Sequence, residues 1–374
     1  MRVVIAGGGT GGHLFPGIAL AEEFKSRTSH NVIIFVGTKK GIEQRIIPKM
    51  GYELKTIAGA GILGRSPLQK MKGLVQFLIG FFQALFLLRS LKPDLILGTG
   101  GYVSASVILA AHLLGMEGAI CEQNSIPGLT NRVLGRFVKK IFIAFEESEV
   151  FFPRKKVFLT GNPVRKEFFL QSFSPQKEED KFTLLILGGS QGARSINQSV
   201  VECLAYLGPL RDKVEIIHQT GFHDFFWVKE AYGKKGFKGE VRPFITEMVR
   251  VYMCADLVIS RAGAITLTEI LISGKPSVLI PYPHAAYNHQ EMNAKNLVHK
   301  GAARMILDKD LSGGTLGEEI VYLINHPEKL KEMGEKAKSL ARPGAARAIV
   351  DHYYYPEGKV DLRSQGTKKG NCHL

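Results

Sequence analysis

Short apolar runs alternate with longer segments of helical character along most of the chain. In the first half the apolar runs cover residues 3–6, 32–36, 95–97, 119–121 and 141–144, and a further run at 182–187 opens the second half. Strands buried on both faces of a parallel sheet are continuously hydrophobic, and each is joined to the next through a helix. The pattern therefore predicts an α/β fold built on parallel sheets.

The pattern restarts after a polar segment at 171–181 that is rich in Ser, Pro, Glu and Lys. A chain of 374 residues is about twice the usual domain size. We therefore predict two Rossmann-like, doubly wound parallel-sheet domains, 1–163 and 164–340, that face a cleft. A helix at about 341–355 is expected to pack back on the first domain, and the polar residues 356–374 are expected to form a disordered tail.

Glycine-rich turns follow three of the apolar runs. They are Gly-Gly-Gly-Thr-Gly-Gly-His at 7–13, Gly-Gly-Ser-Gln-Gly-Ala-Arg-Ser at 188–195, and Arg-Ala-Gly-Ala at 261–264. Glycine lets the backbone approach a ligand closely, and the helix that follows presents its positive end. Because ligands of open α/β sheets bind beyond the carboxyl ends of the strands, we expect the three turns to line one cleft that takes an anion or a sugar.

Several common nucleotide sites are disfavoured. No G-x-x-x-x-G-K-[ST] motif occurs, so ATP hydrolysis of the P-loop type is not expected. The second apolar run leads into Gly37-Thr38-Lys39-Lys40 instead of the acidic residue that binds an NAD ribose, which leaves NADP as a minor alternative. Asp308-Lys309-Asp310 is a literal D-x-D, but its place in the outer part of the second domain favours a solvated loop over a manganese site.

The charge is strongly basic and uneven. The net charge is +15, and residues 1–163 hold 20 Lys and Arg against 10 Asp and Glu. Such an excess favours phosphate-bearing substrates or an anionic membrane surface. Nucleic acid is not an expected partner, because the sequence has no zinc finger, RNP-type motif or basic helix with interleaved aromatics. The four cysteines are scattered without C-x-x-C spacing, which favours a reducing compartment.

One apolar segment, 74–88, is exceptional. It is shorter than the roughly 20 residues needed to cross a bilayer, so we expect most of it to pack on the first sheet. Its apolar residues nevertheless lie nearly all round the predicted helix, and its start is basic. We therefore predict that it also enters an anionic leaflet. The predicted membrane residues are Lys70, Lys72, Leu74, Phe77, Leu78, Phe81, Phe82 and Lys140.

Several sequence blocks together resemble the MurG family of bacterial glycosyltransferases, in order from residue 1 to about 350. They lie at 7–21, 100–104, 122–124, 161–165, 188–194 and 261–269. The resemblance implies a GT-B fold, without metal or cofactor, on the cytoplasmic face of the cell membrane as a peripheral protein. It implies inverting transfer of GlcNAc from UDP-GlcNAc to the C4 hydroxyl of MurNAc in lipid I, undecaprenyl-pyrophosphoryl-MurNAc-pentapeptide, to give lipid II for peptidoglycan.

Other functions stay open on the residues alone. Another UDP-sugar enzyme of the same fold, such as a glycolipid synthase or a UDP-GlcNAc 2-epimerase, would share the donor site. A regulatory protein that binds a nucleotide sugar without turnover is a further alternative.

The resemblance also assigns residues to roles. Inverting transfer needs a base for the acceptor hydroxyl, and His13 and Glu122 are the two candidates. His13 could instead cap its helix or bond a loop carbonyl. Arg165 and Ser190 are assigned to the diphosphate, Glu269 to the ribose, Ile245 to the uracil, and Asn124 and Gln290 to the sugar. The full predicted UDP-GlcNAc set is Thr10, Gly11, Gly12, Asn124, Arg165, Ser190, Ile245, Ala264, Ile265, Thr266, Leu267, Thr268, Glu269 and Gln290.

Two positions depart from the family pattern. Tyr287 stands where relatives often carry an aspartate, and Cys121 stands where a histidine is frequent. Both changes lie next to residues assigned to the sugar, so they weaken the details of that assignment.

Overall fold

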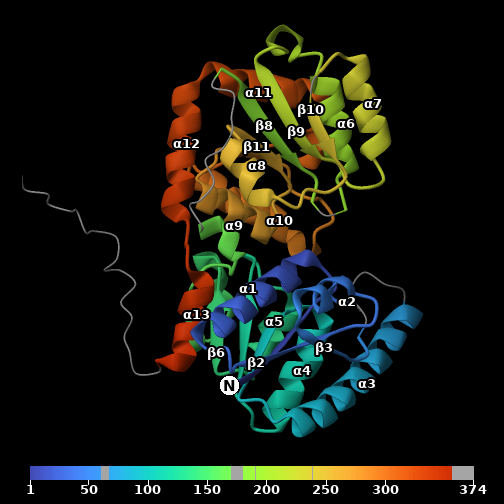
Figure 1. Ribbon diagram of the computed structural model, residues 1–374, viewed down its shortest axis with the longest axis vertical. Coiled ribbons are helices and arrows are strands. Elements are labelled where there is room, and N and C mark those ends of the chain that lie inside the picture. Colours follow the sequence, from blue (N-terminus) through green and yellow to red (C-terminus); the bar gives the residue numbers. More distant parts are fainter. Residues whose placement is uncertain (60–66, 170–179, 190, 238, 356–374) are drawn as a thin grey trace, which may run out of the picture.

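The computed structural model describes residues 1–59, 67–169, 180–189, 191–237 and 239–355. The chain forms two α/β domains, one above the other in Figure 1. Each domain is built on its own sheet, and every strand pair in both sheets is parallel. The predicted fold class is confirmed.

The first sheet has seven strands in the order β3-β2-β1-β4-β5-β6-β7. Every apolar run predicted in the first half coincides with one of these strands, to within a residue at the end of β6. Side chains of β1 alternate between the two faces, because successive residues of a strand point to opposite sides. Val4 and Ala6 enter one core layer, and Val3 and Ile5 enter the other. The strands are β1 (Arg2–Gly7), β2 (Val32–Gly37), β3 (Glu53–Thr56), β4 (Leu95–Gly100), β5 (Gly118–Glu122), β6 (Lys140–Ile143) and β7 (Val157–Leu159).

Helices cover both faces of this sheet. The layer that contains Val4 is completed by α3 (Pro67–Leu91), α4 (Gly101–Leu113) and α5 (Leu129–Leu134). The opposite layer is completed by α1 (Gly11–Arg27), the short α2 (Glu43–Ile46) and the distant α13 (Ala345–Tyr354).

The second sheet has six strands in the order β10-β9-β8-β11-β12-β13. Leu184 and Ile186 of β8 face one core layer, and Leu185 and Leu187 face the other. The strands are β8 (Phe182–Leu187), β9 (Val214–Gln219), β10 (Gly239–Arg242), β11 (Leu257–Ser260), β12 (Ser277–Leu279) and β13 (Arg304–Met305). The helices are α6 (Arg194–Cys203), α7 (Phe225–Lys234), α8 (Met248–Cys254), α9 (Ala264–Ser273), α10 (His289–His299), α11 (Gly313–Asn325) and α12 (Pro327–Leu340).

Short 3-10 turns complete the described secondary structure. They are η1 (Pro48–Met50), η2 (Glu146–Phe151), η3 (Arg154–Lys156), η4 (Lys166–Phe169), η5 (Gly208–Leu210), η6 (Ala286–Asn288) and η7 (Asp308–Asp310).

The end of the described chain returns to the first domain. After α12 the chain runs down the side of the molecule, and α13 lies beside α1 (Figure 1). Ile349 and Val350 are fully buried in the core of the first domain. Arg27 of α1 forms an ion pair with Asp351, and Asn31 donates to the hydroxyl of Tyr354. The predicted tail at 356–374 and most of the polar segment at 171–181 lie outside the described residues.

The apolar segment at 74–88 is part of a longer helix, so the prediction that it is too short to cross a bilayer is wrong. α3 has 25 residues, and the stretch Met71–Leu91 is long and apolar enough to cross a membrane by length and composition. The helical pattern continues beyond both ends that the apolar residues marked. α3 nevertheless packs along α4, with Ala84 and Leu88 fully buried. A Cβ at Gly80 would lie 2.1 Å from the carbonyl oxygen of Ala58.

Candidate active site

The first glycine loop, between β1 and α1, is held in place by a buried glutamate. Gly8 and Gly9 have φ of 158° and 81°, values that favour glycine. The Glu43 carboxylate accepts hydrogen bonds from the amide of Gly9 (2.9 Å) and from the amide and hydroxyl of Thr38 (2.8 and 3.0 Å). A Cβ at Gly8 would lie 2.5 Å from the Glu43 side chain. Glu43 is not predicted from the sequence, because no motif marks it.

His13 lies in the first turn of α1, directly after this loop. Its Nδ1 is 3.1 Å from the carbonyl oxygen of Thr99 near the end of β4, so it bonds a carbonyl, of a strand and not of a loop. That bond occupies Nδ1 as donor and leaves Nε2 as the proton-accepting nitrogen. Gly100 must be glycine here, because a Cβ would lie 2.4 Å from Nδ1.

The environment of His13 favours the neutral imidazole. Burial lowers the pKa of His13 below its ordinary value, and His289 lowers the pKa further. Hydrogen bonds with Gln123 and Thr99 act in the opposite direction but are the smaller causes. His289 begins α10 in the second domain, so this interaction crosses between the domains. A neutral imidazole with Nε2 unprotonated can accept a proton from a substrate hydroxyl.

Glu122, the other candidate base, ends β5 and is buried. Its carboxylate accepts from the amide of Asn124 (2.9 Å), from Nδ2 of Asn124 (3.3 Å) and from Nδ2 of Asn131 (2.8 Å). Burial raises the pKa of Glu122, although these hydrogen bonds oppose the shift. The contacts fix the turn that carries Asn124.

A buried polar bridge joins this turn to the second domain. Oδ1 of Asn293 in α10 accepts from the amide and hydroxyl of Ser125 (2.9 and 2.7 Å). Its Nδ2 donates to Oδ1 of Asn124 and to the carbonyl of Ala262, both at 3.2 Å. Asn162 likewise donates to the carbonyl of Gln123 and to the hydroxyl of Thr268 (3.1 Å). The loops of both domains therefore meet at the junction between the domains.

The second glycine loop, between β8 and α6, is positioned by a neutral amide. Nε2 of Gln219 donates to the carbonyl of Gly189 (2.9 Å), and Oε1 accepts from the amide of Ile245 (2.9 Å). The structure thus brings the predicted uracil residue Ile245 next to this loop. Its side chain is buried, so it can offer mainly backbone atoms. Ser190 lies outside the described residues. Gln219 is a second residue that is not predicted from the sequence.

Arg165 and Glu269, assigned to the diphosphate and the ribose, lie close together. Nη2 of Arg165 is 3.9 Å from Oε1 of Glu269 in α9, and the guanidinium lies 5.5 Å from the ring centre of Phe15 in α1. Tyr252 donates to Oε2 of Glu269 (3.2 Å). Burial raises the pKa of Glu269 to about 7, although Arg165 and Tyr252 lower it.

The first turn of α9 holds several predicted donor residues, but their side chains differ in position. Leu267 is fully buried in the core, and its amide donates to Gly263, so it does not face the cleft. Thr268 is buried, and its hydroxyl donates to the carbonyl of Ala264 (2.8 Å) while it accepts from Asn162. The amides of Ala264, Ile265 and Thr266 form the amino end of the helix, where an anion is favoured.

The remaining predicted residues lie at the edges of the same region. Thr10, Gly11 and Gly12 form the start of α1. Gln290, in α10, accepts from the amide of Tyr282 (3.0 Å). Tyr287 has a left-handed backbone with φ of 54°, and the guanidinium of Arg132 in the first domain lies 5.5 Å from its ring centre.

The D-x-D segment is not a simple solvated loop, so that expectation is wrong for Asp308. Oδ1 of Asp308 is 2.5 Å from Nη1 of Arg261 and accepts from the hydroxyl of Ser195 (2.8 Å). Nη2 of Arg261 also donates to Ser195 (2.9 Å), which ties the third glycine turn to the start of α6. Within the described part of the chain, no three His, Cys, Asp or Glu side chains are grouped to hold a metal ion.

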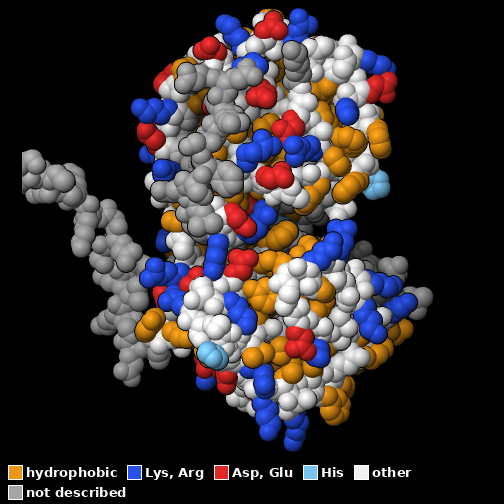
Figure 2. Space-filling model, viewed as in Figure 1, with side chains coloured by type: hydrophobic (Ala, Val, Ile, Leu, Met, Phe, Trp, Pro, Cys, Tyr) orange, Lys and Arg blue, Asp and Glu red, His pale blue; other side chains and the backbone are white. Residues whose placement is uncertain are grey.

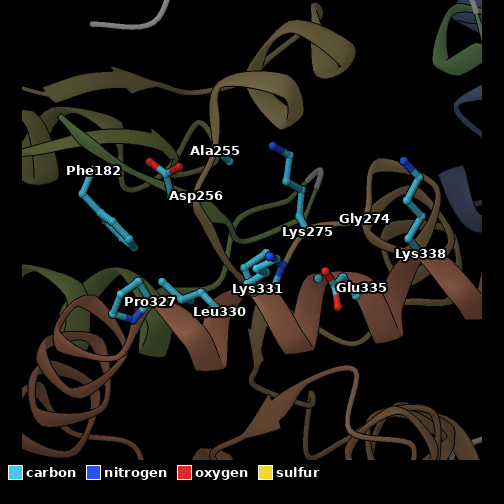
Figure 3. A pocket seen from close by; sticks show the side chains of 12 residues that line it. Phe182, Ala255, Asp256, Gly274, Lys275, Pro327, Leu330, Lys331, Glu335 and Lys338 are labelled. Atoms are coloured by element: carbon cyan, nitrogen blue, oxygen red, sulfur yellow. The ribbon is translucent and has the colours of Figure 1, made fainter. Parts of the chain in front are cut away.

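A pocket of about 500 Å³ lies elsewhere, beside α12 (Figure 3). Phe182 at the start of β8, Asp256 before β11 and Lys275 before β12 line it, together with Lys331 and Lys338 of α12. The pocket is therefore at the amino ends of the strands, away from the glycine loops. None of the predicted site residues lines it.

Comparisons with known proteins agree with this two-domain arrangement. The model of the glycosyltransferase family 28 N-terminal domain matches residues 3–143, and the model of the glycosyltransferase family 28 C-terminal domain matches residues 183–349. The fold and these two matches define the class, a two-domain glycosyltransferase.

Individual relatives narrow the class. Two relatives, from Geotalea uraniireducens and Myxococcus xanthus, are each 48% identical to this protein over 94% of its chain. The match covers 97% of the first relative and 92% of the second, and both carry the same name. The name is UDP-N-acetylglucosamine--N-acetylmuramyl-(pentapeptide) pyrophosphoryl-undecaprenol N-acetylglucosamine transferase. The crystal structure of Acinetobacter baumannii MurG matches with a TM-score of 0.75 and 31% identity over 94% of this chain and 98% of that one. The chain belongs to the MurG group of glycosyltransferase family 28.

More distant structures share the fold alone. A UDP-GlcNAc 2-epimerase from Neisseria meningitidis, bound to UDP-GlcNAc, matches with a TM-score of 0.67 but only 14% identity, over 95% of this chain and 100% of that one.

Proposed function

We propose that this enzyme transfers GlcNAc from UDP-GlcNAc to the C4 hydroxyl of MurNAc in lipid I and so forms lipid II. The 48% identity to relatives of that name over 94% of the chain supports the substrates. The observation that carries the proposal is the position of the Arg165 guanidinium, which lies between Phe15 of α1 and Glu269 of α9. A cation at this point neutralises a diphosphate that both domains can reach.

The acceptor side supplies the base. His13 Nε2 takes the proton of the acceptor hydroxyl as its oxygen bonds to the anomeric carbon of GlcNAc. The bond from that carbon to the diphosphate oxygen breaks, and UDP leaves with the electron pair. His13 is favoured over Glu122, because the Glu122 carboxylate is held by Asn124 and Asn131.

The donor side stabilises the leaving group. The amides of Ala264, Ile265 and Thr266 and the guanidinium of Arg165 face the charge that develops on the diphosphate. Glu269 accepts the ribose hydroxyls, and the backbone at Ile245 faces the uracil. Because these groups neutralise the diphosphate, the proposal needs no metal.

UDP release from UDP-GlcNAc, measured with and without a lipid I analogue over a range of pH, tests this proposal. We expect release that depends on the acceptor and falls at least about 100-fold in His13→Ala. Release that survives in His13→Ala with an unchanged pH profile, but is lost in Glu122→Gln, would transfer the base to Glu122. Release without any acceptor dependence in the wild type would contradict the transferase and favour another UDP-sugar enzyme.

We also infer a membrane partner and a peripheral location on the cytoplasmic face of the cell membrane, because the acceptor is lipid-linked. The outer face of α3 supports this. Leu74, Leu78 and Phe82 are 53%, 47% and 55% exposed, and Lys72 is exposed beside them. Peripheral contact is favoured over a membrane span, because Ala84 and Leu88 on the inner face are buried in the domain core.

We infer a different set of membrane residues from the exposure of the α3 side chains. Phe81 packs against the core and Phe77 is half-buried, whereas Met71, Val75, Ile79 and Phe86 are exposed but were not predicted. Lys140 is not brought to α3, since its Nζ donates to the carbonyl of His352 and lies 4.2 Å from the ring centre of Tyr353 in α13. The side chain of Lys70 lies outside the described residues.

Flotation with anionic vesicles tests the membrane contact. We expect the double variant Leu78→Ser/Phe82→Ser to float at least tenfold less than the wild type. The control Val150→Ser changes a 77% exposed side chain outside α3 and should float normally. Equal recovery of all three proteins would contradict the role of α3.

A further inference from the structure

The second domain carries an exposed aromatic cluster that the proposed function does not use. It consists of the exposed Phe222 and Phe226 and the half-buried Phe225, which together we call the aromatic rim. Phe222 and Phe226 are 69% and 79% exposed, and the rings of Phe225 and Phe226 meet edge to face with centres 5.2 Å apart. Soluble proteins seldom expose several large aromatic side chains together unless the surface binds something.

The rim has a fixed place in the fold. Phe222 follows β9, and Phe225 and Phe226 begin α7, next to the edge strand β10. The buried side chain of Asp224 accepts from Asn197 (2.8 Å) and from Nε1 of Trp227 (2.9 Å), which anchors the start of α7. The aromatic rings are therefore held outward on a rigid turn.

The rim and α3 lie on the same side of the molecule. In Figure 1, α7 and β10 are on the right of the upper domain, and α3 is on the right of the lower domain. Hydrophobic side chains are visible over both places in Figure 2. The junction of the two domains lies between them (Figure 1). One flat surface could touch both.

The charge beside the rim fits an anionic surface. The ammonium of Lys229 lies 5.7 Å from the ring centre of Phe225, and Lys229 is exposed. The side chain of Arg194, 3.7 Å from Asp224, is 73% exposed. Aromatic rings with adjacent basic side chains are typical of segments that enter the headgroup region of a bilayer.

We propose that the aromatic rim is a second membrane contact, so that the enzyme touches an anionic lipid surface through both domains. This inference rests on the proposed function, which places the lipid-linked acceptor at the cleft. Membrane binding strengthens with the apolar area that enters the interface, and the rim adds to the area that α3 supplies. Contact through both domains also sets their relative orientation on the bilayer with the cleft facing the lipid.

The only tryptophan of the chain makes the test specific. Trp227 lies next to Phe226 in α7, and α3 contains no tryptophan. Energy transfer from Trp227 to dansyl-labelled lipid in vesicles with anionic headgroups therefore reports the approach of the rim, and sedimentation of the same vesicles reports binding by either contact. Four proteins are compared. They are the wild type, the rim variant with both Phe222→Ser and Phe226→Ser, the α3 variant with both Leu78→Ser and Phe82→Ser, and the control Val150→Ser.

We expect strong energy transfer in the wild type and in Val150→Ser. The rim variant should lose most of the transfer and bind vesicles about tenfold more weakly, while turnover of a water-soluble acceptor analogue stays within twofold. Wild-type binding without energy transfer, or a rim variant that binds vesicles normally, would overturn the proposal. So would a rim variant that loses turnover of the soluble acceptor, because the rim would then contact substrate or a protein partner.

Failure of this inference is distinct from failure of the proposed function. If the wild type turns over the soluble acceptor but its Trp227 shows no transfer, the transferase stands and the second contact is wrong. If no acceptor-dependent UDP release occurs, the transferase is wrong whatever the vesicle binding shows.

Discussion

The two glycine loops that open the two domains look alike in sequence but are held in different ways. The loop after β1 is fixed by the acidic side chain of Glu43, which accepts from Gly9 and Thr38. The loop after β8 is fixed by the neutral side chain of Gln219, which donates to Gly189 and accepts from Ile245. The same backbone motif is therefore combined with a different charge in each domain.

We infer from this difference that, of these two loops, the second is the one beside the diphosphate, which we propose to lie at the start of α9 and Arg165. An acidic side chain under a loop disfavours an anion above it, whereas a neutral amide adds no charge beneath the loop. The second loop also has Arg194 and Arg261 nearby. The first loop instead leads into His13 of α1, a group suited to proton transfer. The glycine pattern alone predicts two ligand-facing loops, and the supporting residue distinguishes them.

The largest expected effect comes from Gly192→Ala in the second loop. Gly192 has φ of 80°, and a Cβ there would lie 2.2 Å from the carbonyl oxygen of Thr220. Backbone strain and a clash with main chain together should lower the free energy of unfolding of the second domain by about 4 kcal/mol. Gly189→Ala is the matched control, since it has φ of 81° but open space at the Cβ. Equal urea denaturation midpoints for the two variants would show that the close approach is unimportant.

The next effect concerns Glu269, a buried acidic residue of the donor side. Burial raises the pKa of Glu269 to about 7. Above about pH 4.5 the unfolded chain releases this proton while the folded chain retains it, so the free energy of unfolding falls as the pH rises. The loss should be about 2.5 kcal/mol between pH 5 and pH 8. Glu269→Gln should remove this dependence.

Denaturant unfolding at pH 5 and pH 8 measures this change in the free energy of unfolding. Glu335→Gln, which changes an exposed carboxylate of α12, should keep the pH dependence of the wild type. A Glu269→Gln variant that also keeps it would show that Glu269 is already ionised in the folded protein at pH 5.

A charge exchange between the two loops tests the comparison directly. Gln219→Glu places a carboxylate under the second loop, and we expect UDP to bind about 30-fold more weakly, a loss of about 2 kcal/mol. Glu43→Gln should leave UDP binding unchanged but lower turnover, because the loop that carries His13 loses an acceptor. Titration calorimetry with UDP gives the first result and UDP release the second. Equal losses of UDP affinity in both variants would contradict the assignment of the diphosphate to the second loop.

The sequence predicts the fold more completely than the site. Continuous apolar runs locate the buried strands, because a parallel strand is hydrophobic on both faces. Glu43 and Gln219 have no such signal: each bonds the backbone of a glycine loop 30 or more residues away, and only the tertiary structure brings them together. The apolar segment at 74–88 shows the same limit, since composition cannot say which face of α3 packs on α4.

The smallest expected effect concerns Asp308, which the sequence presents as half of a D-x-D. Asp308 pairs with Arg261 and accepts from Ser195, so it fixes the third glycine turn against α6. Asp308→Asn keeps the shape but removes the charge beside a mostly buried guanidinium. We expect stability to fall by about 1 kcal/mol and UDP affinity to fall about threefold. Asp310→Asn, at the exposed other end of the motif, should change neither.

A metal site would behave differently, because both carboxylates would then act as ligands. In that case the two variants would lose activity together, and EDTA would abolish UDP release from the wild type. If Asp308 acts through Arg261, only the Asp308→Asn variant should bind UDP more weakly. The loss of UDP affinity should be the same with EDTA as with added manganese. The pair of variants therefore separates a motif that is present in the sequence from the interaction that the fold makes with it.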